Sequence, residues 1–249
     1  MSEAQSMRRT FRQRELGFFG GASYYLGDIN PRKHFINNHL AGGIFFRYST
    51  NYRYAWRFGF NYGNLSASDA GSGEPDQIER NASFKTPVYE LHALAEFNFV
   101  EYRIGHNRHR FTMFVFAGLA GNYTSPQSDF GLGYDRGMGA MVEARTKNYS
   151  RYQVAVPFGI GLKFNIGDKC GLGFEWGPRK TYTDLLDDVS GTYNENAIYL
   201  HPAPEGNAGY SKAAGNMRGN PRTKDWYFFY GVTLTFKLKD PGKPCHAYR

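Results

Sequence analysis

The chain has 249 residues, with 17% aromatic residues, 30 glycines and a formal net charge of +8. No run of 18 or more apolar residues occurs, which excludes a helical membrane span on hydropathy. Lys and Arg are scattered without a dense basic run, so the positive charge does not indicate a nucleic-acid partner. The frequent Gly, Tyr and Phe favour many strands over packed helices.

Eight segments alternate between apolar and polar side chains, as strands with two different faces do. In chain order, the predicted strands are residues 15–25, 40–49, 54–63, 88–99, 111–123, 152–164, 171–182 and 226–238. The first has a mixed pattern in which Leu16 stands opposite Glu15, and the second sets Phe46 against Arg47. The third and fourth alternate more cleanly, so two-faced strands are predicted there.

The fifth to eighth segments differ in how clearly they separate two faces. The fifth is apolar on both faces apart from Thr112 and Asn122, so its pattern does not tell which face is polar. The sixth is the clearest, because alternate residues from Tyr152 to Phe164 are all apolar. The seventh and eighth alternate again, and the eighth carries a row of Phe, Tyr, Val and Leu on one face.

The connections between these segments alternate in length. Short ones lie at about 49–53, 100–110 and 165–170, and long ones at about 26–39, 64–87, 124–151 and 183–225. Outer-membrane barrels show this asymmetry, with short periplasmic turns, long extracellular loops and an even number of strands. Both ends of the predicted barrel are then expected on the short-turn side.

Side-chain size indicates which face points outward. The apolar face carries Trp, Phe, Tyr and Leu, whereas the polar face is rich in Gly, Ala, Ser and Thr. Eight strands enclose an interior that is only wide enough for side chains, so the large apolar groups are expected to face lipid, the reverse of a lipocalin. Aromatic residues near strand ends suggest an interfacial girdle: Tyr24, Tyr54, Tyr62, Tyr123, Tyr152, Tyr182 and Trp226.

The predicted fold is therefore all-β, an eight-stranded antiparallel transmembrane barrel of the cell outer membrane. It covers residues 15–238, after an N-terminal periplasmic segment at 1–14 and before a periplasmic C-terminal tail at 239–249. The sequence MSEAQSMRRTFRQRE contains no apolar core of a signal peptide. Either the chain is cytoplasmic or its signal has been removed, and the predicted outer-membrane barrel favours a removed signal. We expect outer-membrane lipid rather than nucleic acid as a partner.

The polar face carries a set of charged residues that would point into the lumen. They are Glu15, Arg47, Arg57, Glu90, His92, Glu96, Lys163, Glu175, Arg179 and Lys237. Four carboxylates against five Lys and Arg residues are close to balance, so buried ion pairs can satisfy one another. We expect these pairs to occlude the lumen, and we interpret His92 as a hydrogen-bonded lumen residue rather than a catalytic base.

Chemistry-bearing motifs are weak in this sequence. His106 and His109 have a spacing that could suit a metal, but they lie in a predicted turn flanked by Arg, and no carboxylate is expected nearby. We therefore interpret this segment as a solvated basic turn. No nucleophile and base of an esterase can be recognised. We therefore expect no catalytic, metal-binding or cofactor-binding residues and no enzyme activity.

Five stretches resemble the PorG family of outer-membrane barrels from Bacteroidetes-type bacteria. They are ELGFFGGASYYLGD (15–28), AGGIFFRYSTNYRYAWR (41–57), YELHALAEFNF (89–99), VPFGIGLKFNIGDKCGLGFEWGPRKTYTDLLDDVSGTY (156–193) and GNPRTKDWYFFYGVTLTFKL (219–238). The resemblance implies a component of the type IX secretion system that is tied on the periplasmic side to the PorK and PorN ring. It implies no catalytic residues. A surface barrel that acts through its external loops, as an adhesin or protective protein, is the alternative, and a lipid-modifying enzyme is a third.

The two cysteines, Cys170 and Cys245, fall on the same periplasmic side of the predicted topology. The periplasm is oxidising, so a disulfide between them can persist. Such a bond would hold the tail against the barrel rim, where Lys239, Lys243 and Cys245 would form a partner-binding face. Free thiols, or a bond to a partner protein, are the alternatives.

Overall fold

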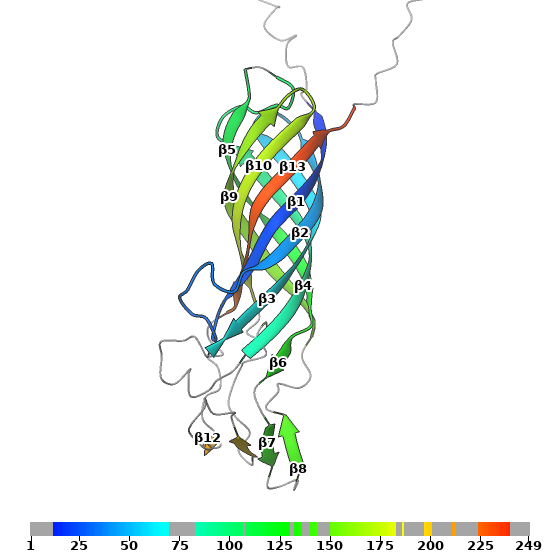
Figure 1. The fold of residues 1–249 in the computed structure, drawn as a ribbon. Coiled ribbons are helices and arrows are strands. Elements are labelled where there is room, and N and C mark those ends of the chain that lie inside the picture. Colours follow the sequence, from blue (N-terminus) through cyan, green and yellow to red (C-terminus); the bar gives the residue numbers. More distant parts are fainter. Residues whose placement is uncertain are drawn as a thin grey trace, which may run out of the picture.

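The protein forms a closed antiparallel barrel of eight long strands (Figure 1). The computed structural model describes residues 12–69, 83–106, 108–129, 132–135, 140–143, 150–182, 186, 197–200, 211–212 and 224–239. The barrel strands are β1 (Gln13–Leu26), β2 (His39–Ser49), β3 (Tyr54–Ser68), β4 (Ser83–Asn98), β5 (Phe111–Thr124), β9 (Tyr152–Ile166), β10 (Cys170–Thr181) and β13 (Trp226–Lys237).

Each barrel strand pairs with its neighbours in the order β3-β2-β1-β13-β10-β9-β5-β4, and the pairing of β3 with β4 closes the ring. The predicted eight-stranded antiparallel barrel is thus confirmed, with β1 beginning two residues earlier than expected. Both terminal strands meet the short turns at one end of the barrel, and the long connections leave the other end (Figure 1). We call these the short-turn end and the long-loop end.

Short strands also occur within the long connections, where the sequence pattern predicted none. β6 (Gln127–Asp129) pairs with the extended end of β4. A separate four-stranded sheet is formed by β7 (Leu132–Asp135), β8 (Ala140–Glu143), β11 (Ala197–Leu200) and β12 (Ser211–Lys212). This sheet lies beyond the long-loop end of the barrel (Figure 1). No helix among the described residues is long and apolar enough to cross a membrane.

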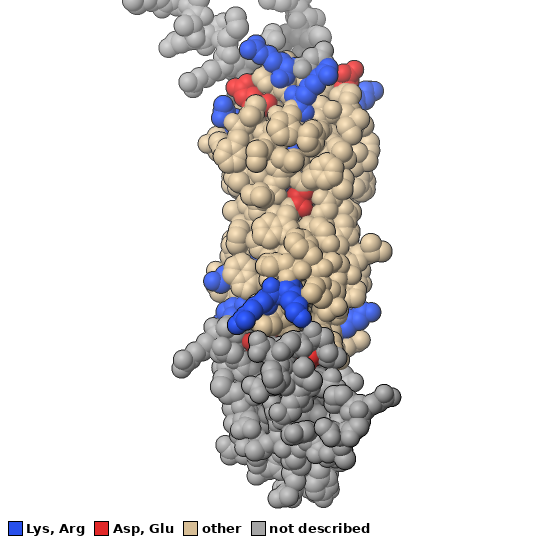
Figure 2. Space-filling model, turned by 60° about the vertical axis from the view of Figure 1, so that its left-hand side comes forward, with Lys and Arg blue, Asp and Glu red and all other residues tan. Residues whose placement is uncertain are grey.

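The outer wall of the barrel is apolar between the two ends, apart from one acidic residue visible in its middle (Figure 2). Outward residues such as Trp56, Leu91 and Val154 expose 50%, 66% and 56% of their surface. Lys and Arg side chains gather toward the two ends of this wall (Figure 2). Exposed side chains of this size on every strand form a continuous apolar band, which a soluble protein would bury.

Aromatic rings border the apolar band at both ends. At the long-loop end, Tyr62, Tyr89, Tyr123 and Tyr152 are direct cross-strand neighbours, with ring centroids 5.1, 6.2 and 5.2 Å apart. At the short-turn end, Phe97 packs on its neighbours in the same way. Tyr89 and Phe97 lie eight residues apart on β4, or about 20 Å along the axis at about 3.4 Å per residue and a tilt of about 40°. This height suits the apolar band of an outer-membrane barrel.

β3 and β4 extend five residues beyond their predicted ends, and the polarity of their faces reverses there. Past the tyrosine row, Leu65 and Phe84 point inward and are buried, whereas Ser68 and Lys85 point outward and are exposed. The inward-apolar pattern is that of a sheet in water. The change of polarity at the tyrosine row therefore marks a boundary between apolar and aqueous surroundings. Because the apolar face changes side at this boundary, the sequence pattern placed the ends of β3 and β4 there.

Candidate functional site

The lumen near the short-turn end holds three cations around one carboxylate. Glu96 on β4 is fully buried. It accepts hydrogen bonds from side chains of other strands and forms ion pairs with them. Its oxygens lie 2.8 Å from Arg47 Nε, 3.0 Å from Arg57 Nε and 2.6 Å from Lys163 Nζ. Lys163 also donates to Asn98 Oδ1 at 2.9 Å. One carboxylate thereby links strands β2, β3, β4 and β9.

Two further carboxylates balance the charge of this cluster. Arg47 NH1 lies 2.9 Å from Glu15 Oε2 on β1, and Arg57 NH1 lies 2.6 Å from Glu175 Oε2 on β10. The Glu96 cluster therefore joins three carboxylates to three cations and is neutral overall. Breaking one such pair would leave an uncompensated buried charge, which costs more than the pair itself contributes.

A second cluster lies closer to the long loops and is centred on Glu90. Arg179 Nε lies 3.2 Å from Glu90 Oε2, and the Tyr227 hydroxyl donates to the same oxygen at 2.7 Å. Asn61 Nδ2 donates to Glu90 Oε1 at 3.0 Å, and His92 Nδ1 lies 3.2 Å from that oxygen. His92 therefore lies beside a carboxylate, in the hydrogen-bonded position that the sequence indicated.

Phenylalanine side chains fill the lumen between the charged groups. The Arg57 guanidinium lies 5.2 Å from the Phe45 ring centre and 4.9 Å from that of Phe116, and Lys163 Nζ lies 4.2 Å from that of Phe114. Cation–π attraction is strongest where, as here, the cation is out of water. Sequence reasoning missed this layer, because Phe114 and Phe116 make the inward face of β5 look as apolar as its outward face.

Glycines on adjacent strands make room for these rings. Gly17 and Gly59 flank Phe45 in the register, and Gly161 and Gly159 stand opposite Phe114 and Phe116. A Cβ atom at Gly17 or Gly161 would overlap the facing ring. The pairing of each inward Phe with Gly on the next strand is a sequence signal that could have resolved the ambiguous pattern of β5.

Both mouths of the barrel are closed by buried side chains. At the short-turn end, residues 99–106 and 108–110 fold over the opening, where Tyr102 is 6% exposed and Ile104 fully buried. Asn165 Nδ2 fastens this connection by donating to the Arg103 carbonyl at 2.5 Å. The short turn predicted there is therefore a cover over the barrel mouth.

At the long-loop end, Leu186 is fully buried in an apolar cluster with Tyr25, Tyr227 and other inward residues. Its backbone N–H donates to Asp225 Oδ2 at 3.0 Å, and the Tyr25 hydroxyl donates to the other oxygen of Asp225 at 2.8 Å. Thr86 Oγ1 donates to the Leu186 carbonyl at 2.9 Å. A connection between β10 and β13 thus places an apolar side chain in the mouth and fixes it by hydrogen bonds.

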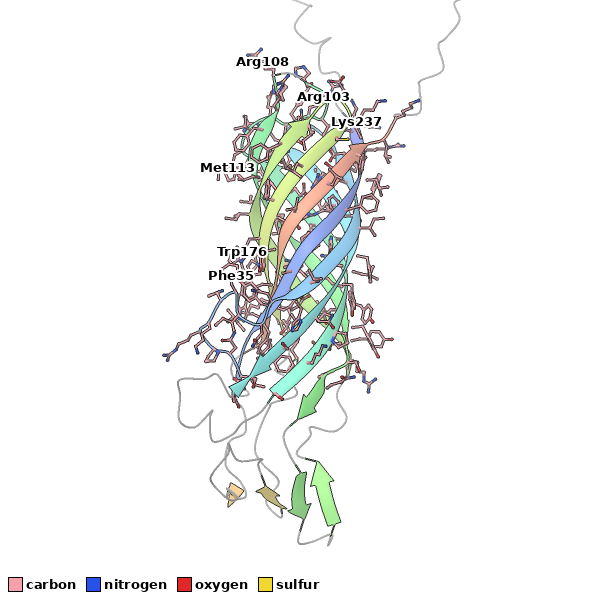
Figure 3. All side chains as sticks on the ribbon, in the orientation of Figure 1. Phe35, Arg103, Arg108, Met113, Trp176 and Lys237 are labelled. Atoms are coloured by element: carbon pink, nitrogen blue, oxygen red, sulfur yellow. The ribbon has the colours of Figure 1, made fainter. Side chains whose placement is uncertain are left out.

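The remaining predicted residues lie at the short-turn rim. Lys237 is half-buried at the end of β13 (Figure 3), and none of the ion pairs between described residues includes it. Cys170 is half-buried at the start of β10, and Lys239 is exposed. Lys243 and Cys245 lie outside the described residues, so the disulfide and the tail surface stay predictions.

The turn that holds His106 and His109 departs from the sequence interpretation in one respect. His109 Nε2 lies 3.6 Å from Glu101 Oε2, although no carboxylate was expected nearby. Burial raises the pKa of Tyr102 in the same connection. A carboxylate that is near in space is hidden from spacing arguments when the chain folds back on itself.

A closed eight-stranded barrel with an apolar outer wall, a packed polar lumen and turns of unequal length defines a β-barrel protein of the outer-membrane type. The chain belongs to the family described as Domain of unknown function (DUF6089), whose model matches residues 4–249. No curated protein matches the chain.

Solved outer-membrane barrels have a similar fold. A major outer membrane protein from Thermus thermophilus is 9% identical, with a TM-score of 0.43 over 91% of this chain and 99% of that one. Neisserial surface protein A is 10% identical, with a TM-score of 0.42 over 91% and 97%. Ail of Yersinia pestis, in complex with the heparin analogue sucrose octasulfate, is 11% identical, with a TM-score of 0.38 over 90% and 97%. At these values nothing about function follows from the likeness.

Proposed function

We propose that the protein is a non-enzymatic barrel subunit of the type IX secretion system, which anchors a periplasmic ring of the PorK and PorN type to the outer membrane. The observation that carries the proposal is the filled lumen, closed by Tyr102 and Ile104 at one mouth and by Leu186 at the other. A barrel that offers no path through its centre acts through its wall and its two rims. The sequence resemblance to the PorG family supports the secretion role.

Placement in the outer membrane is supported by the outer wall. The apolar band lies between two rows of aromatic rings, and the faces of β3 and β4 reverse polarity just past one of them. Lipid is the environment that suits such a band. With short turns toward the periplasm, the long loops and the sheet of β7, β8, β11 and β12 would face outward.

The short-turn rim supports a protein partner on the periplasmic side. Its exposed cations are Arg12, Arg14, Arg53, Arg108, Arg110, Lys169 and Lys239. Among the described acidic residues of this rim, only Asp168 is exposed, and Glu101 is half-exposed. Figure 3 shows Arg103 and Arg108 at this end of the barrel. A rim of this sign would attract an acidic protein surface, because complementary charge speeds association and fixes orientation.

The secretion proposal is tested by site-specific photo-crosslinking in living cells. A crosslinking amino acid at Arg108 or Lys169 is expected to capture periplasmic ring proteins, since both positions are exposed at the short-turn rim. The same amino acid at Lys85, exposed at the other end, is the matched control and is expected to capture none. Capture of ring proteins from neither rim position, in cells that hold the folded barrel, would contradict the proposal.

A surface role through the long loops is the second candidate. It is favoured by the four-stranded sheet of β7, β8, β11 and β12, which lies beyond the barrel mouth. Ordered structure in a connection of this kind often serves binding. Crosslinks from Lys85 to host or neighbouring-cell proteins, without crosslinks from Arg108, would favour this candidate.

A further inference from the structure

The connection between β1 and β2, residues 27–38, folds back over the outside of the barrel. Its Phe35 ring lies 5.1 Å from that of Tyr24 and 5.3 Å from that of Tyr230 between ring centroids. Tyr24 accepts a hydrogen bond from Trp176 Nε1 at 3.1 Å. Figure 3 shows Phe35 and Trp176 close together on the wall. Tyr24 is therefore fully buried beneath the connection, although a girdle position was expected.

The contact with Tyr230 shows how far the connection reaches along the wall. Trp226 begins β13 at a predicted girdle position, and Tyr230 lies four residues farther toward the short-turn end. Four residues span about 10 Å along the axis, at about 3.4 Å per residue and a tilt of about 40°. The next outward residue, Val232, is 38% exposed and belongs to the apolar band. Phe35 therefore lies at the edge of the band and not beyond the mouth of the barrel.

The tip of the connection, Phe35 and Ile36, turns apolar surface away from the barrel. The two side chains are 53% and 42% exposed, although Phe35 packs on rings of two strands. Leu40, where the chain enters β2, is 88% exposed. Apolar side chains that are exposed as a group mark a contact surface. The tip therefore extends the apolar surface of the wall.

The backbone of the connection is held in an unusual conformation. Asn30 Nδ2 donates to the Lys33 carbonyl at 2.8 Å, and Asn38 Nδ2 donates to the Phe35 carbonyl at 2.6 Å. Phe35 and Asn37 have φ angles of 59° and 53°, a left-handed conformation that is unfavourable for a bulky residue such as Phe. Such a conformation persists only where surrounding contacts hold it. For Phe35, the contacts of its ring with the wall have this role.

We propose that Phe35 and Ile36 are inserted among the acyl chains of the outer leaflet, held there by the Phe35 ring, so that the connection is a re-entrant membrane segment. Lipid fits this surface because the surface is apolar and continuous with the wall. The exposed parts of the two side chains amount to roughly 200 Å², far below the roughly 800 Å² per partner of a specific protein interface. This inference rests on the membrane placement proposed above and is independent of the secretion role.

The test is photolabelling of the wild-type protein in phosphatidylcholine vesicles that contain a phospholipid with a diazirine in the middle of one acyl chain. Light releases nitrogen and leaves a carbene that inserts into nearby C–H bonds, and peptide mass mapping then locates the label. Label is expected on Phe35 or Ile36 and on Ile160, which is 55% exposed on the wall. Asn51, exposed in the short turn between β2 and β3, is the control in water and is expected to carry none.

Two glycine variants form a matched pair, because glycine tolerates the left-handed φ at both positions. Phe35→Gly removes the ring that packs on the wall, so Ile36 is expected to lose most of its label. Asn37→Gly keeps the ring and is expected to be labelled like the wild type. Equal labelling of Ile36 in the two variants would contradict the role of the Phe35 ring. If Phe35→Gly lacks the heat-modifiable mobility of a folded barrel, the labelling of the wild type decides alone.

A spin label on Ile36→Cys, with both native cysteines replaced by Ser, measures depth and separates lipid from protein as the surroundings of the tip. The label is expected about 5–10 Å below the head groups, open to oxygen and closed to a water-soluble nickel chelate. A label closed to both would mean that a protein, such as a second copy, covers the tip, and this would overturn the inference.

The wall residue Ile160 keeps the failures of the two proposals apart. Photolabel on Ile160 of the wild type, with none on Phe35 or Ile36, would overturn the re-entrant connection and leave the membrane placement intact. No label on Ile160 either would remove the membrane placement and this inference with it.

Discussion

Replacement of Glu96 by Gln is expected to destabilise the barrel strongly. The carboxylate is fully buried and lies within 3.0 Å of three cations. Glu96→Gln keeps the shape but leaves Arg47, Arg57 and Lys163 with two carboxylates, so one positive charge in the lumen is uncompensated. Removal of one partner of a buried ion pair costs about 3–5 kcal/mol, and we expect a loss of this size in the free energy of unfolding.

The measurement is urea unfolding of the protein in lipid vesicles, followed by heat-modifiable mobility. The matched control is Glu96→Gln/Lys163→Met, which removes one charge of each sign and restores a neutral cluster. We expect this double variant to recover at least about half of the lost stability, because burying no charge is often as favourable as burying a pair. A free energy of unfolding of Glu96→Gln within about 1 kcal/mol of the wild-type value would refute the reasoning. So would a double variant that loses more stability than the sum of the losses of Glu96→Gln and Lys163→Met, each measured alone.

Three further predictions concern the lumen wall and the tail. Gly161→Ala is expected to cost about 1–3 kcal/mol of unfolding free energy, because its Cβ would overlap a lumen ring, whereas Gly121→Ala, with open space around it, is expected to be near neutral in the same urea assay. Non-reducing peptide mass mapping is expected to find Cys170 linked to Cys245, and two alkylated thiols in protein from oxidising conditions would contradict this. A copy that ends at Lys239 is expected to insert normally but to recruit less periplasmic partner in crosslinking, and undiminished recruitment would exclude the tail as a docking surface.

The barrel could be predicted from sequence because side chains in a strand have a period of two. β9 shows this best, since every second residue from Tyr152 to Phe164 is apolar. At the extensions of β3 and β4 the period of two continues, but the polarity of the two faces reverses, so that the apolar Leu65 and Phe84 point inward. A prediction that follows one apolar face along the sequence ends where that face becomes polar. A strand that crosses from lipid into water is therefore predicted too short.

The charged residues of the lumen could be placed on the correct face, but their partners could not be predicted. Glu96 meets Arg47 and Lys163, which lie 49 and 67 residues away along the chain. Such pairs depend on the register of the whole barrel and on which strands face each other across it. The covers at the two mouths were missed for a similar reason, because Tyr102 and Leu186 belong to connections and acquire a core role only when the connection folds back.

That the lumen is sealed is tested most directly by planar-bilayer recording of the purified, folded protein. Insertion is verified by heat-modifiable mobility of the same protein in the lipid vesicles that are fused with the planar bilayer. With two ion-paired clusters and buried side chains in both mouths, the inserted barrel is expected to pass no stable current at moderate voltage. Stable, unitary open-channel currents from the wild-type protein would contradict a closed barrel that acts through its rims.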